Sequence, residues 1–192
     1  MPRGALLCAL AVVAALVGCD IGDARTCGPD GTGEQVDDVA ATFGVTEFVA
    51  EVRTPGAAAF LWAPEASQFP DEAIHVLCLG DRVNEAGSSQ IPLLSDVVAA
   101  TATRIGASIS GLNGEFTVEP GYLLGIVNRE TVVSLEVAWT TPASDEEARW
   151  EVGVDPGFLL VPVPAGVPPE ATFTYRFLDE DGEAVWVERD GS

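Results

Sequence analysis

The chain has 192 residues, 47% of them hydrophobic, and a formal net charge of −21 at pH 7 that is set by 30 acidic and nine basic side chains. A field of this sign repels phosphate backbones, so the composition argues against nucleic acid as a partner. The length suits one domain with its own core, and a solvated surface accounts for the excess of acid.

The N-terminus resembles the signal peptide of a bacterial lipoprotein. Arg3 precedes an apolar run, residues 5–17, that is shorter than the about 20 residues of a membrane-spanning helix. The run ends in Leu-Val-Gly-Cys, residues 16–19, which is typical of a lipobox. The resemblance implies removal of residues 1–18 by cleavage between Gly18 and Cys19. It also implies that the Cys19 sulfur carries acyl chains such as palmitate, which would hold the protein on the extracytoplasmic face of the cell membrane. The alternative is an ordinary secretory signal with a chance cysteine.

The remaining cysteines predict one disulfide. Of the four cysteines, Cys8 leaves with the signal and Cys19 would carry lipid. Cys27 and Cys78 are left as a pair in an oxidising compartment, where disulfides persist. The alternative is two separately buried thiols, since the sequence has neither a Cys-x-x-Cys motif nor enough ligands for a zinc site.

Composition divides the mature chain into a tether and a folded domain. Residues 20–39 are rich in Asp, Gly and Thr and have little apolar periodicity, so residues 19–44 are predicted to be the lipidated N-terminus and a flexible tether. From residue 45 onward, short apolar segments alternate with turn residues. This pattern predicts that residues 45–192 form one all-β, immunoglobulin-like sandwich.

The first predicted strands form a hairpin, residues 47–53 and 57–63, around Thr54-Pro55-Gly56. The next strand, residues 74–79, is apolar on both faces, which indicates that both are covered. His75 on this strand is therefore predicted to be packed rather than reactive. Residues 91–105 are ambiguous, because Ser95-Asp96 suits a helix cap whereas the following β-branched residues favour a strand.

The second half predicts four further strands, at residues 122–127, 133–139, 150–154 and 158–163. A last hairpin joins residues 172–177 and 185–187 through the Asp181-Gly182 turn signal. Four prolines between residues 161 and 170 lack the amide hydrogen that a central strand needs. They place that segment at a sheet edge or in a loop.

The order of these segments resembles a β-rich module of exported proteins from high-GC Gram-positive bacteria. The resemblance rests on Gly125-Ile126-Val127, on the Val-rich residues 133–137, on the apolar residues 154–164 that end in proline, and on the aspartate-rich turn before Gly182. It implies a fold and carries no established activity.

The residue types of catalysis and metal binding are sparse. A Ser-His-Asp or Cys-His site would need His75, which is the only histidine, and no serine lies in a Gly-x-Ser-x-Gly motif. Pairs of carboxylates are inevitable among 30 acids and therefore point to no particular site. Asp179 and Asp181 are a candidate calcium site because calcium prefers oxygen ligands, although a two-strand turn explains the same residues without metal. No other metal and no cofactor is predicted, and the four tryptophans are predicted to pack in the core.

The sequence therefore predicts a membrane-anchored extracytoplasmic lipoprotein that acts as a non-catalytic binding or interaction module of the cell envelope. Its partner would be an unknown envelope protein or ligand. The alternatives are an envelope hydrolase that uses paired carboxylates and a purely structural envelope component. An enzyme would gather acids in a deep pocket, whereas a binding module would present a flat face or an edge strand.

Overall fold

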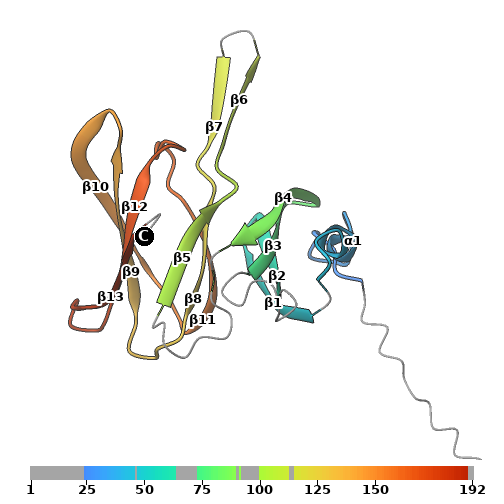
Figure 1. The fold of residues 1–192 in the computed structure, drawn as a ribbon, viewed down its shortest axis with the longest axis horizontal. Coiled ribbons are helices and arrows are strands. Elements are labelled where there is room, and N and C mark those ends of the chain that lie inside the picture. Colours follow the sequence, from blue (N-terminus) through green and yellow to red (C-terminus); the bar gives the residue numbers. More distant parts are fainter. Residues whose placement is uncertain are drawn as a thin grey trace, which may run out of the picture.

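Three β-sheets and one helix stack in four layers in a computed structural model, which describes residues 24–45, 47–63, 73–89, 91, 100–112 and 115–189. From right to left in Figure 1, the layers are helix α1, an N-terminal sheet, a middle sheet and an outer sheet. All strand pairs in these sheets are antiparallel. The prediction of an all-β sandwich is confirmed.

The N-terminal sheet is a meander in the order β1-β2-β3-β4. Its elements and the helix that covers it are α1 (Val36–Ala41), β1 (Glu47–Thr54), β2 (Ala57–Ala63), β3 (Ala73–Leu79) and β4 (Arg82–Ser89). Strands β2 and β3 are buried at nearly every position. Both faces of β3 are therefore covered, as its continuous apolar sequence predicts.

The other two sheets form an immunoglobulin-like sandwich. The middle sheet has the order β11-β8-β5 and the outer sheet the order β10-β9-β12-β13, which is a Greek-key connectivity of seven strands. Their bounds are β5 (Ala100–Ile105), β8 (Tyr122–Val127), β9 (Ser134–Thr141), β10 (Ser144–Gly153), β11 (Gly157–Pro162), β12 (Thr172–Leu178) and β13 (Ala184–Arg189). A hairpin of β6 (Ser108–Leu112) and β7 (Glu115–Glu119) connects β5 to β8 and extends beyond the sheets (Figure 1).

Apolar side chains fill the space between each pair of layers. Strand β8 shows the pattern most clearly, because Leu124 and Ile126 pack toward the N-terminal sheet while Leu123 and Val127 pack toward the outer sheet. Gly125 lies between them, and a Cβ atom there would overlap the carbonyl oxygen of Thr101 on β5. The middle sheet is thus buried on both faces, and each fully buried aliphatic side chain contributes about 1.5–3 kcal/mol.

The N-terminal segment differs from the predicted tether. Residues 24–44 are part of the folded body: Thr26 forms a β-bridge with Gln35, and Val36 and Ala40 of α1 are buried against the N-terminal sheet. The Glu34 amide also donates to the carbonyl oxygen of Asp81 at 2.9 Å. Composition missed this because backbone hydrogen bonds and a disulfide, rather than a regular apolar pattern, hold most of the segment.

Candidate functional site

The predicted lipid-attachment site lies outside the described residues. Gly18 and Cys19 both precede the first described residue, so cleavage and lipidation remain predictions. Within the part of the chain that the structure describes, no helix has the length and apolar character needed to span a membrane.

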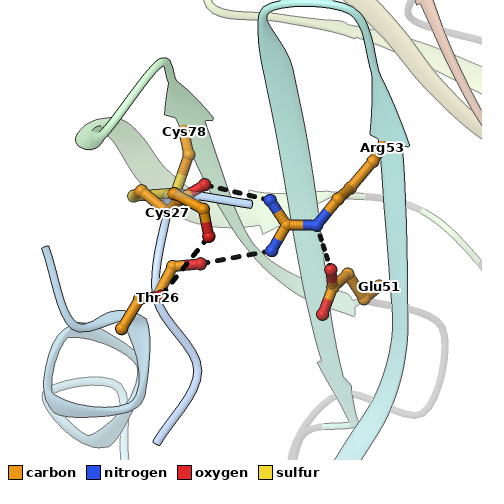
Figure 2. A network of polar contacts seen from close by, with 6 residues as sticks. Thr26, Cys27, Glu51, Arg53 and Cys78 are labelled. Carbon is orange, nitrogen blue, oxygen red and sulfur yellow. Dashed lines mark hydrogen bonds and ion pairs between the residues drawn. A yellow bond between two sulfur atoms is a disulfide. The ribbon is translucent and has the colours of Figure 1, made fainter. Parts of the chain in front are cut away.

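The predicted disulfide between Cys27 and Cys78 is present, with 5.3 Å between the Cα atoms. It joins the N-terminal segment to β3, and Figure 2 shows the side chains that surround it. Arg53 on β1 donates to the carbonyl oxygens of Cys27 at 3.0 Å and Thr26 at 3.3 Å, and its Nε donates to the Glu51 carboxylate (Figure 2). The disulfide and the guanidinium therefore both hold Cys27, and the guanidinium also holds Thr26.

A second arginine holds the start of this segment. The Arg25 guanidinium donates to the Asp37 carboxylate at 2.8 Å, and it lies over the Phe48 ring with 3.6 Å to the ring centroid. The Arg25 amide donates to the other oxygen of Asp37 at 2.9 Å. The N-terminal segment is therefore docked on α1 and β1 before the chain reaches the disulfide.

The calcium candidates lie in the tight turn between β12 and β13. One carboxylate oxygen of Asp179 accepts hydrogen bonds from the amides of Asp181 at 3.1 Å and Glu183 at 2.9 Å. These bonds make Asp179 the first residue of a turn that its side chain stabilises. Among the described residues, no three His, Cys, Asp or Glu side chains gather as metal ligands.

His75 lies in a buried hydrogen-bonded chain with two residues of the next strand. The Ser89 hydroxyl is 2.5 Å from Nδ1 of His75, and the Glu85 carboxylate is 3.3 Å from Nε2. Because Nε2 donates to the carboxylate, Nδ1 accepts from the hydroxyl in the neutral ring. The second carboxylate oxygen of Glu85 accepts the Gly106 amide at 2.6 Å. The His75 hydrogen bond lowers the pKa of Glu85, burial opposes this effect, and the Gly106 amide adds to it.

These three residues, here called the buried brace after its two buried members, are the residue types of a hydrolytic triad. The Glu85 side chain is 39% exposed, but the burial of His75 and Ser89 suits a structural role. His75 is 2% exposed and Ser89 is 5% exposed. A nucleophilic hydroxyl must reach a substrate carbonyl, and a hydroxyl at this depth does not. The brace instead ties β3 and β4 to the end of β5. Its position confirms that His75 is packed, while the involvement of Glu85 and Ser89 was not predicted.

The outer face of the outer sheet is the open surface of the sandwich. Side chains alternate along its strands, so Trp139 and Phe173 pack inward while Glu136 and Val187 point outward. Val187 is 52% exposed. In the part of the chain that the structure describes, this face therefore forms part of the solvent-exposed surface.

A shallow recess of about 280 Å³ lies on this face. Its lining residues come from four neighbouring strands and are Ala138, Trp139, Thr140, Glu147, Thr172, Phe173, Thr174 and Arg189. Register pairs Thr172 with Thr140, and Thr174 with both Ala138 and Arg189. Small side chains on the two central strands form the floor, while a carboxylate on β10 and a guanidinium on β13 flank it.

A chain of ion pairs borders the recess. Arg149 donates to Glu147 at 2.6 Å and to Glu136 at 3.4 Å, and Arg176 donates to Glu136 at 2.6 Å. The Arg176 hydrogen bond is the main cause that lowers the pKa of Glu136, and burial opposes it. With Arg189, three of the nine basic side chains of this acidic protein lie on one sheet face. The face is thus locally balanced in charge.

The tryptophans pack in the core, as predicted. Trp62 is 3% exposed, and Trp139, Trp150 and Trp186 pack against the core of the sandwich. No sequence pattern predicts the recess, because its floor is made of ordinary threonines from strands that are distant in the sequence.

Comparison of the chain with family models, with curated proteins and with solved structures finds no match.

Proposed function

We propose that the protein is a lipid-anchored extracytoplasmic lipoprotein whose folded body is a non-catalytic binding module at the cell envelope. The observation that carries this proposal is the order of the layers: the N-terminal segment docks beside α1 at one end of the stack, and the open face of the outer sheet lies at the other end (Figure 1). An anchor and a binding face at opposite ends suit a module that is displayed from a membrane.

The proposed anchor site is close to the docked segment in the sequence. Only eight residue steps separate Cys19 from Cys27, which is buried and bonded to β3. Such a length spans at most about 28 Å when fully extended. Lipid on Cys19 would therefore hold the body near the bilayer, and two or more acyl chains would do so stably.

The open face supports binding rather than catalysis. Its recess is shallow and is lined by a single carboxylate, Glu147, rather than by converging acids. His75 and Ser89, which are residue types of a hydrolytic triad, are instead buried. A broad face with a small recess is the surface expected of an interaction module.

Detergent partition tests the anchor. The full chain is expressed in a bacterium supplied with labelled palmitate, and lysates are separated into detergent and aqueous phases. Wild type should carry label and enter the detergent phase, while Cys19→Ser should lose the label and move to the aqueous phase. Cys8→Ser is the matched control. Because Cys8 lies in the predicted signal peptide, its substitution should change neither the label nor the detergent partition. Retention of label by Cys19→Ser would refute the proposal.

A further inference from the structure

We infer that the recess on the outer sheet binds a short zwitterionic peptide, with Glu147 holding the ammonium end and Arg189 the carboxylate end. This inference rests on the proposed binding function but not on the lipid anchor. Opposite charges on the two flanking strands distinguish this recess from a uniformly acidic surface.

The spacing of the strands sets the length of the ligand. Strand β10 carries Glu147 and β13 carries Arg189, with β9 and β12 between them. Three strand spacings separate the two backbones by about 14 Å, and both side chains line the recess between them. The recess of about 280 Å³ is also smaller than sites for drug-sized ligands, which begin at about 300 Å³. Two or three small residues match both dimensions.

The floor supplies hydrogen bonds for a peptide backbone. Thr140, Thr172 and Thr174 line the recess, and each hydroxyl both donates and accepts. Peptide N–H and C=O groups need both kinds of partner. Ala138 also lines the recess, but it is only 1% exposed, so the threonines form most of the accessible floor.

Charge and the arrangement of aromatic residues disfavour other ligands. The net charge of −21 opposes a ligand with net negative charge, whereas a zwitterion carries none. The two aromatic residues of the lining, Trp139 and Phe173, pack toward the sandwich core, so their rings do not offer the recess a stacking platform for a sugar. Glu147 gives one oxygen to Arg149, and its second oxygen can accept from an ammonium group.

The test is a titration of the full chain, purified in detergent, followed through the methyl signals of threonine by NMR. Trialanine with free ends should shift the signals of the three floor threonines, and trialanine blocked at both ends should bind about tenfold more weakly, since it lacks both charges. For Glu147→Gln, blocking the amino end of trialanine should no longer lower its affinity. For Arg189→Gln, blocking the carboxyl end of trialanine should no longer lower its affinity.

Glu151→Gln removes an exposed carboxylate from the same strand outside the recess lining and should leave trialanine binding unchanged. Equal affinity for free and blocked trialanine, or no shift at millimolar peptide, would overturn the inference. Stronger shifts of the same signals with N-acetylglucosamine would replace it with a saccharide site. Detergent partition is a separate readout, so a failed titration leaves the anchor proposal standing.

Discussion

Removal of the Cys27–Cys78 bond by the double substitution Cys27→Ala and Cys78→Ala should lower the free energy of unfolding by about 4 kcal/mol. The two cysteines are 51 residues apart. Closing a loop of that length in the unfolded chain costs about 14 cal/mol/K of entropy, or about 4 kcal/mol at 25 °C. Alanine is chosen because both positions are buried, and a serine hydroxyl there would add a separate cost.

Loss of the disulfide should lower the free energy of unfolding of the whole fold. Local opening should nevertheless appear first in the N-terminal segment. Without the bond, the N-terminal segment is still held by Arg25, Arg53 and the Glu34 amide bonded to Asp81. These polar contacts are partly exposed and open more readily than the cores between the sheets. Hydrogen exchange should therefore accelerate first at the amides of residues 27 and 34, before it does so in strand β8.

Urea unfolding monitored by far-ultraviolet circular dichroism measures the effect. The double variant should keep the native spectrum, unfold at lower urea, and show a larger dependence on urea because its unfolded chain expands further. Single Cys27→Ala and Cys78→Ala variants should each lose most of the same stability, since either one opens the loop. A double-variant loss below about 1 kcal/mol would refute the loop-entropy reasoning.

Three further changes test other contacts. Arg104→Gln should lower stability by about 3 kcal/mol in urea, because the guanidinium donates to the carbonyl oxygens of residues 120, 167, 168 and 169, while exposed Arg129→Gln should have little effect. Gly125→Ala should cost about 1–3 kcal/mol by forcing β5 from β8, whereas Gly153→Ala, whose added Cβ would meet only an ordinary contact, should cost less. The lowered pKa of Glu85 means that its charged form stabilises the fold at pH values above the ordinary glutamate pKa of 4.5, and that this stabilisation is lost as the pH falls below 4.5. Between pH 7 and pH 3, the melting temperature of wild type should therefore fall more than that of Glu85→Gln.

Strand positions were predictable because their signals are local. The Pro55-Gly56 and Asp181-Gly182 turns fall where the sequence places them, and β1, β2, β12 and β13 flank them. The continuous apolar run of β3 also indicated two covered faces. The identity of the covering layers was not predictable, since α1 and the middle sheet are brought to β3 by contacts between residues distant in sequence.

The buried brace shows why a site can escape sequence reasoning. A regular hairpin that starts from the pair Leu79 and Arg82 would set His75 opposite Ala86. A register shift between Leu77 and Cys78 moves the pairing by one residue, so His75 faces Gly87 instead. Because neighbouring residues point to opposite faces, that single step brings Glu85 and Ser89 to the face of His75. No local sequence pattern predicts this register shift.

Directional contacts join the N-terminal segment and the three sheets. Arg53 joins β1 to the N-terminal segment, Glu85 joins the N-terminal sheet to Gly106 at the end of β5, and Thr101 of β5 donates to Glu188 of β13 at 3.0 Å. Apolar burial drives the layers together but does not depend on their relative direction, whereas hydrogen bonds do. The four layers are therefore held in one orientation. For the proposed lipoprotein, an anchor at Cys19 would therefore join the stack at the end with α1, and the recess lies on the sheet at the other end.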